Sequence, residues 1–142
     1  MAKSMLCESD ILDITHRLWK HFNNREWDLA ENLLSKKFEA DWPQTRERII
    51  GPHNFIELNR RYPGEHRIEL LMKQYVGFDD ARKHRAVTQV YIESIIPGQK
   101  EMKLFAISFF KIAENGLIEA ATEYWADMYD APDWRKDLVE KI

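Results

Sequence analysis

The segment Met102–Ile112, which reads MKLFAISFFKI, decides the fold of this chain. Successive side chains of a β-strand point to opposite faces, so the even-numbered and odd-numbered residues of this segment separate. The even face is apolar except at Ser108, and the odd face carries Phe105, Ile107 and Phe109. A strand that is apolar on both faces must be covered on both. The segment therefore predicts the middle of a sheet that lies between two layers.

Three further segments with a period of two surround this strand. Turns that contain proline–glycine, asparagine–glycine or a run of charged residues join neighbouring strands as hairpins. Four such strands in succession predict an antiparallel meander. The other three strands are expected at residues 67–78, 85–95 and 117–127, with turns at residues 79–83, 97–99 and 114–116.

The first half of the chain shows helical spacing instead. Apolar residues recur every three or four positions and predict helices over residues 10–23, 26–35 and 52–62, with a short strand over residues 37–42. Asp130 is suited to cap a C-terminal helix that has Trp134, Leu138 and Val139 on its buried side. Helices followed by a meander predict an α+β fold in which the helices pack on one face of the sheet.

Helices on one face leave the second apolar face without cover. Phe105, Ile107 and Phe109 lie on that outer face in this arrangement. A second copy of the chain is the simplest layer that can cover them. The sequence therefore predicts a homodimer that buries the outer face of the sheet.

Length and composition limit the class of protein. The 142 residues are expected to form a single domain, residues 1–142. The composition, with 44% hydrophobic and 32% charged residues, excludes a disordered chain. A net charge of -3 argues against a nucleic-acid partner. The longest apolar run, residues 104–110, is too short to cross a membrane. One cysteine, Cys7, and no apolar leader lead us to expect a cytoplasmic protein.

Motifs for metals and cofactors are missing from the sequence. The five histidines show no HxH or HExxH spacing, and a lone cysteine cannot build a cysteine zinc cluster, so no metal site is expected. The sequence also has no Walker loop, GxGxxG or GxSxG motif. We therefore expect no cofactor.

Three stretches carry a resemblance to a known family. They are residues 41–49, with DWPQ and ERI, residues 54–64, with NF and YPG, and residues 116–125, with GLI and TEYW. Together with the order of helices and strands, they resemble the SnoaL-like branch of the nuclear transport factor 2-like superfamily. The resemblance implies a conical fold in which N-terminal helices pack on a curved, mainly antiparallel sheet and enclose an apolar pocket, usually in a homodimer.

The resemblance leaves two classes of function open, because its members include polyketide cyclases, a steroid isomerase, dehydratases, epoxide hydrolases and proteins without known activity. The first is a lyase, isomerase or hydrolase that acts on an apolar, carbonyl-bearing small molecule. The second is a non-catalytic module for ligand binding or dimerisation. In the first class, and in the ligand-binding form of the second, the expected partner is a small apolar molecule.

Polar residues on otherwise apolar strand faces are the candidate ligand-binding residues. We expect Trp42 to roof a cavity, with Asp41 or Gln44 at its rim. Gln74, Ser108 and Thr122 are expected in the same cavity, because neighbouring strands lie only about 4.8 Å apart. This expectation depends on one shared register, since a slip of one residue exchanges the two faces of a strand.

Asp41 and Tyr124 are the candidate catalytic residues. Apolar surroundings beside Trp42 would raise the pKa of Asp41 and make it a useful proton acceptor, although it alternates with Trp42 and can equally face solvent. Tyr124 follows Thr122 on the same strand face. The resemblance implies that acid–base members carry an acid near residues 120–122, where this chain has Ala-Ala-Thr. That departure favours the non-catalytic class.

Overall fold

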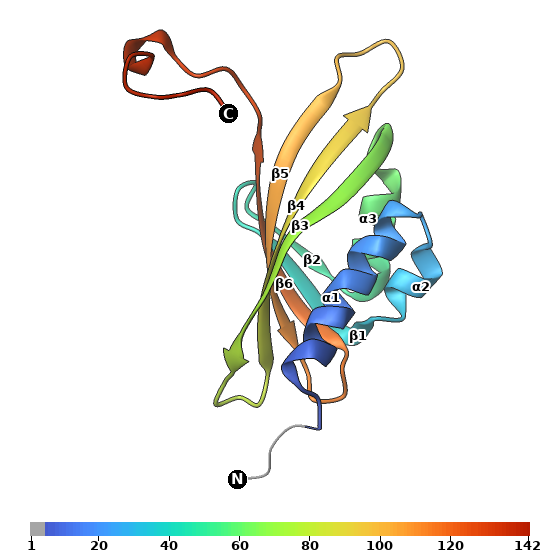
Figure 1. Ribbon diagram of the computed structural model, residues 1–142. Coiled ribbons are helices and arrows are strands. Elements are labelled where there is room, and N and C mark those ends of the chain that lie inside the picture. The colour runs from blue at the N-terminus through green and yellow to red at the C-terminus, as the bar shows by residue number, and fades with distance from the viewer. Residues whose placement is uncertain (1–4) are drawn as a thin grey trace.

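The computed structural model describes residues 5–142. Within this range the chain forms three α-helices and one six-stranded sheet (Figure 1). No helix in residues 5–142 has the length and apolarity needed to cross a bilayer. The helices are α1 (Glu8–Asn23), α2 (Trp27–Glu31) and α3 (Pro52–Arg61), and the strands are β1 (Leu34–Trp42), β2 (Glu47–Ile50), β3 (Glu65–Phe78), β4 (His84–Ile95), β5 (Met102–Ile112) and β6 (Ile118–Asp127).

The sheet has the strand order β2-β1-β6-β5-β4-β3. Strands β3 to β6 form the antiparallel meander that the sequence predicts. Strand β1 lies parallel to β6, and β2 pairs antiparallel with β1 at the edge. The predicted α+β architecture, with helices before a mainly antiparallel sheet, is therefore confirmed.

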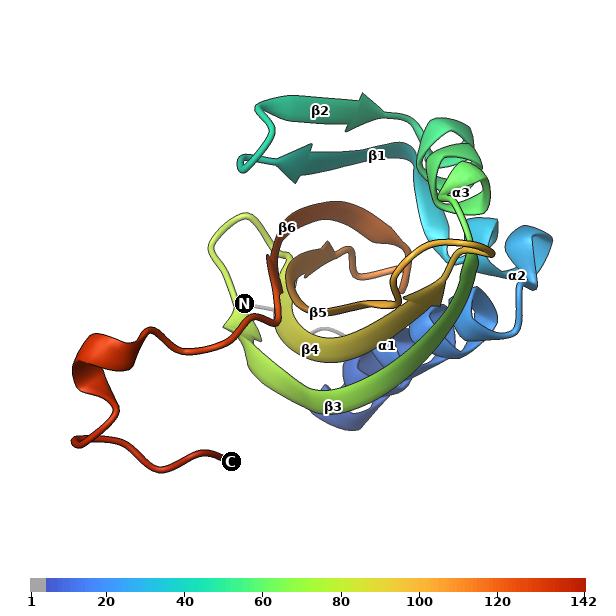
Figure 2. The ribbon, with the colours of Figure 1, turned by 90° about the horizontal axis from the view of Figure 1, so that it is seen from above.

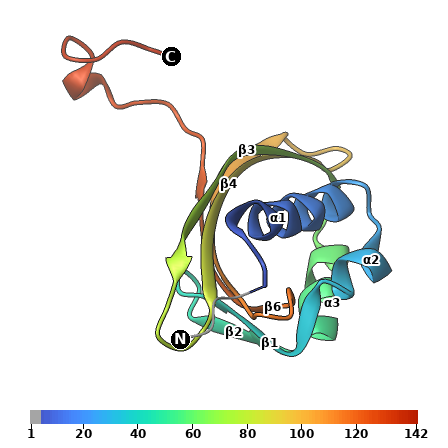
Figure 3. The same cartoon turned by 60° about the horizontal axis from the view of Figure 1, so that its bottom comes forward.

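The sheet is strongly curved, and the helices cover only its concave face (Figures 2 and 3). Figure 3 shows β3 and β4 wrapping around α1. A buried hydrogen bond of 2.9 Å from Trp19 Nε1 to Thr88 Oγ1 joins α1 to β4. Both polar atoms would be without a partner if they separated, so the bond fixes how α1 sits on the sheet.

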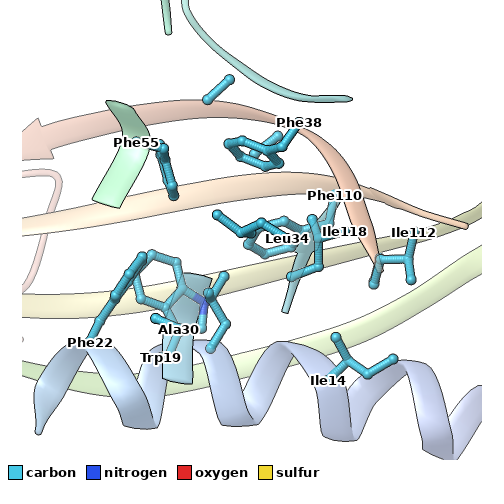
Figure 4. Close-up of a cluster of buried hydrophobic side chains, with 14 of the residues drawn as sticks. Ile14, Trp19, Phe22, Ala30, Leu34, Phe38, Phe55, Phe110, Ile112 and Ile118 are labelled. Atoms are coloured by element: carbon cyan, nitrogen blue, oxygen red, sulfur yellow. The ribbon is translucent and has the colours of Figure 1, made fainter. Parts of the chain in front are cut away.

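The core consists of buried apolar side chains between the helices and the sheet (Figure 4). Phe38 of β1 and Phe55 of α3 have ring centroids 4.9 Å apart, and Phe22 of α1 lies 5.9 Å from Phe55. Each fully buried side chain of this size contributes about 1.5–3 kcal/mol to folding. This aromatic cluster joins α1, α3 and β1 beside the candidate site.

Two elements of the N-terminal half differ from the predictions. The helix expected over residues 26–35 ends at Glu31, and β1 begins at Leu34. Strand β2 has no helix or strand prediction to match it. The helix ends early because Leu34 pairs with the distant Ile118, and local spacing cannot reveal such a pair. Strand β2 has only four residues, too few for a periodic signal, and it pairs with the neighbouring β1.

The predicted C-terminal helix is wrong. Only a short 3-10 turn, Asp133–Arg135, forms after β6. Trp134 is 75% exposed, and Leu138 is 77% exposed, so the expected buried side packs on nothing within the described chain. A short amphipathic helix draws most of its stability from packing, which this extended segment lacks. Figures 1 and 3 show the segment leaving the body on the side of the sheet opposite the helices.

Candidate functional site

A cavity of about 320 Å³ lies between the concave face of the sheet and the helices. Its walls are mainly aromatic and aliphatic, and four of the five tryptophans of the chain line it. A cavity of this size and character fits a small apolar molecule. The lining residues are Trp19, Phe22, Arg25, Trp27, Trp42, Asn59, Arg60, Tyr62, Gly64, His66, Ile68, Ile92, Ser94, Leu104, Ala106, Glu123 and Trp125.

Glu123 is the acidic residue in this wall. It lies on β6 opposite Ser108 of β5, and its exposed fraction is 8%. Trp42 Nε1 donates a hydrogen bond of 3.0 Å to Glu123 Oε1. Ser108 Oγ donates one of 2.5 Å to Glu123 Oε2. Three strands, β1, β5 and β6, therefore position this one carboxyl group.

Burial raises the pKa of Glu123 above the ordinary value of 4.5. The hydrogen bonds from Ser108 and Trp42 act in the opposite direction, but desolvation has the larger effect on the pKa. A glutamate that keeps its proton to higher pH can both accept and return a proton. Glu123 is thus the group in the wall best suited to acid–base chemistry.

The sequence prediction misses Glu123 because of a β-bulge. Ile112 pairs with Ile118, but Lys111 pairs with Ala120, so β6 contains one extra residue at the start of the hairpin. Without the bulge, Thr122 would lie opposite Ser108. With it, Glu123 takes that place. The acid is therefore present one position after the residues where the resemblance implies it.

The structure brings only part of the predicted ligand site together. Trp42 lines the cavity, and Ser108 lies fully buried behind Glu123. Thr122 pairs with Phe109, so it lies on the convex face of the sheet. Gln74 pairs with Val87 on that same convex face. The prediction of one cavity shared by all these residues is therefore corrected.

Gln74 changes faces for the same reason as Thr122. The β3–β4 register shifts by one residue between Leu70 and Met72. Before the shift, Ile68 lies on the concave face, where it lines the cavity. After the shift, odd-numbered residues such as Tyr75 take that face, and Gln74 turns outward. Simple alternation from the start of the strand cannot anticipate this change.

The two predicted catalytic residues also lie outside the cavity. Tyr124 pairs with Ile107 on the convex face. Asp41 accepts hydrogen bonds of 2.7 and 3.1 Å from the Arg48 guanidinium. These bonds lower the pKa of Asp41, which is the opposite of the expected direction. The ion pair with Arg48 stabilises the ionised form of Asp41, so the geometry does not favour Asp41 as a proton acceptor.

Gln44 lies near the cavity wall without lining it. Its Oε1 accepts a hydrogen bond of 3.1 Å from the backbone N–H of Trp125. Trp125 packs edge-on against Trp42, with ring centroids 5.1 Å apart. Gln44 therefore supports the two indoles that form one side of the cavity.

Comparisons with known proteins identify the fold. No protein-family model and no curated protein sequence matches this chain. Among solved structures, a candidate ketosteroid isomerase from Kribbella flavida has a TM-score of 0.76 and 23% identity, over 94% of this chain and 90% of that one. An NTF-2 like protein of unknown function from Burkholderia xenovorans has a TM-score of 0.72 and 23% identity, over 95% and 97%.

A third similar structure contains a ligand. It is a Mycobacterium tuberculosis protein in complex with estradiol-17β-hemisuccinate, with a TM-score of 0.67 and 10% identity, over 82% of this chain and 94% of that one. Identities this low show a shared fold and nothing finer. The fold of this chain is the nuclear transport factor 2-like fold.

Proposed function

We propose that this chain, with its nuclear transport factor 2-like fold, binds an apolar, carbonyl-bearing small molecule in the cavity and moves a proton on it with Glu123. One observation carries the proposal. A buried carboxyl group with a raised pKa lies in the wall of a cavity that is otherwise mainly apolar. Such a combination of a shifted pKa and a cavity is typical of catalytic acids and bases.

The proposed reaction begins with the ionised form of Glu123. Its carboxylate takes a proton from the carbon beside the carbonyl, and the electron pair of the broken C–H bond moves into an enolate. The protonated carboxyl then returns the proton to the same carbon or, where a C=C bond is conjugated with the enolate, to its γ-carbon. Return to the γ-carbon is an isomerisation. In a lyase reaction, the enolate re-forms the carbonyl and expels a leaving group from the β-carbon, and Glu123 gives its proton to that group.

The comparisons support this proposal at the level of ligand class. One similar structure is named as a candidate ketosteroid isomerase, and another holds a steroid ester. Both names concern molecules with a large apolar body. The mainly apolar cavity of this chain has the character that such a body requires.

A non-catalytic role is the second candidate, and one observation favours it. Both oxygens of Glu123 already accept a hydrogen bond, from Trp42 and from Ser108. In this alternative, Glu123 has a structural role and joins β1, β5 and β6 through its hydrogen bonds. The cavity then binds its ligand without changing it. The two candidates differ in whether a bound ketone exchanges its protons.

Deuterium exchange into α-tetralone, an apolar bicyclic ketone, distinguishes the two candidates. We expect the protein to accelerate the loss of the α-proton NMR signals in D₂O. Glu123→Gln should lower that acceleration by a factor of about 10²–10⁴, the usual contribution of a general base. Glu119→Gln is the matched control, because Glu119 lies on the same strand but pairs with Lys83. Binding of α-tetralone without acceleration would overturn the catalytic proposal in favour of the second candidate.

We also propose a homodimer through the convex face of the sheet, in a cytoplasmic protein whose one cysteine, Cys7, is free. Ile107, Phe109 and Tyr124 are exposed on this face. Phe109 and Tyr124 contact each other, with ring centroids 6.4 Å apart. A second copy suits this face because the C-terminal segment leaves the body on the same side, where its exposed Trp134 and Leu138 can pack against that copy (Figure 1).

A further inference from the structure

Two arginines line the cavity. Arg25 belongs to the turn between α1 and α2, and Arg60 lies near the end of α3. Both are exposed, whereas Glu123 of the same lining is buried. The cavity lining therefore combines a buried acid, aromatic walls and two solvent-exposed arginines, and we call the part near the arginines the mouth.

The turn that contains Arg25 has an unusual backbone conformation. Arg25 has a left-handed φ of 58°, a conformation that costs a residue with a side chain about 1–2 kcal/mol. Its N–H bonds to the carbonyl of Phe22 at 3.2 Å and closes the turn. Within residues 5–142 the guanidinium of Arg25 forms no hydrogen bond or ion pair. Its five N–H donors therefore remain available to a ligand.

Two acids near these arginines bond to groups other than Arg25. Glu57 bonds to Arg60 at 2.5 and 2.9 Å and to Arg61 at 2.8 Å. These bonds lower the pKa of Glu57 to about 2, so one carboxylate serves two guanidinium groups. Glu26, which follows Arg25 in the chain, is bonded to His21 and Asn24 instead. Glu57 and Glu26 thus leave the guanidinium of Arg25 without an acidic partner among the described residues.

We propose that the cavity takes an amphipathic ligand whose anionic group, a carboxylate, binds Arg25 at the mouth while its apolar body extends toward Glu123. This inference rests on the proposed function of the cavity and narrows the substrate class to apolar acids that carry a second carbonyl. A guanidinium matches a carboxylate because its planar fork donates two parallel hydrogen bonds. Arg60 adds charge at the same mouth.

Arg25 also has a possible structural role, because cations stabilise the C-terminal ends of helices such as α1. That role and the proposed one predict different effects on ligands. A structural arginine affects all ligands alike. An arginine that binds the anionic group affects only ligands that carry one.

A matched pair of fluorescent probes separates these roles. 1-Anilinonaphthalene-8-sulfonate and N-phenyl-1-naphthylamine share one apolar body, but only the first is anionic. We expect Arg25→Gln to weaken binding of the anionic probe about tenfold, the effect of one charge-assisted hydrogen-bonded contact, and to leave the neutral probe unchanged. Arg25→Lys should retain only part of the affinity, because it keeps the charge but lacks the planar fork.

Arg46→Gln is the matched control, because Arg46 is also exposed with a left-handed φ of 60° but lies outside the cavity lining. Estradiol-17β-hemisuccinate should displace the neutral probe better than uncharged estradiol, which extends the result from a sulfonate to a carboxylate. If neither probe binds, the cavity proposal itself fails. If both bind and Arg25→Gln changes neither, or weakens both equally, the cavity proposal stands and the role of Arg25 is overturned.

Discussion

Two acidic residues on neighbouring strands show how strongly surroundings control a carboxyl group. Asp41 pairs with Thr122 in the β1–β6 register, one position away from Glu123. The Arg48 guanidinium lowers the pKa of Asp41, whereas burial raises the pKa of Glu123. The convex side supplies a cation and solvent, and the concave side supplies aromatic rings. The same sheet thus keeps one acid ionised and prepares the other for proton transfer.

The raised pKa of Glu123 predicts how stability depends on pH. Between the ordinary pKa of 4.5 and the raised folded value, the native state binds more protons than the unfolded state. The free energy of unfolding attributable to Glu123 therefore falls as pH rises through this window. The stability of Glu123→Gln relative to the natural protein should increase over the same range, as measured by urea unfolding at a series of pH values.

Glu119→Gln provides the reference for this measurement, since Glu119 sits on the same strand as part of an ion pair with Lys83. Its stability relative to the natural protein should not show the same rise. A relative stability of Glu123→Gln that stays constant, or decreases, as pH rises would contradict the raised pKa.

Part of the candidate site could be predicted from the sequence at the level of single residues. Trp42 and Ser108 were identifiable because they interrupt or end apolar strand faces. Glu123 was not, because a bulge beside Ile112 exchanges it with Thr122. The alternation of apolar residues does not reveal where a single extra residue is inserted. Every side chain beyond that residue nevertheless lies on the opposite face of the sheet.

At the scale of elements, the connection from α3 to β3 shapes the mouth of the cavity. Gly64 has a φ of 92°, and it lines the cavity between Tyr62 and His66. A Cβ at this position would lie 2.7 Å from Ile96 Cγ1 and 2.8 Å from the carbonyl oxygen of Ile95. Glycine is therefore required here both for its backbone conformation and for close packing against the end of β4.

Gly64→Ala should destabilise the protein and disturb the cavity mouth. Gly98→Ala is the matched control, because Gly98 also has a left-handed φ, of 77°, but a Cβ there meets open space. Both variants carry the backbone cost, and only Gly64→Ala adds a clash of about 1–3 kcal/mol. Thermal or urea unfolding measures the difference, and equal destabilisation by the two substitutions would refute this packing account.

Some helices and strands could be predicted from the sequence, and others could not. The strands after Pro63 were predictable because long alternating runs end at recognisable turns, such as residues 97–99. Strand β2 was not, because residues 47–50 are too few for a periodic signal and pair with β1. The apolar spacing after Asp130 indicates a helix, but the described chain offers that spacing no surface to pack against.

At the scale of the whole molecule, the apolar convex face predicts self-association. Phe109→Lys places a charge at the centre of that face and should convert a dimer to a monomer in light scattering at micromolar concentration. Leu29→Lys on α2 is the control, since Leu29 is 47% exposed and Phe109 is 48% exposed. It should leave the dimer intact. A natural protein that is monomeric under these conditions would contradict the proposed interface.

The proposed function requires that Glu123, in the wall of the cavity, has a raised pKa. The most direct test is a ¹³C NMR titration of the Glu123 side-chain carboxyl, assigned with Glu123→Gln, in the free protein and in the presence of saturating α-tetralone. We predict a pKa above 4.5 in the free protein, and a further rise when the ligand displaces water from the cavity. A pKa at or below 4.5 in both states would show that Trp42 and Ser108 hold an ordinary carboxylate, and would contradict the proposed function.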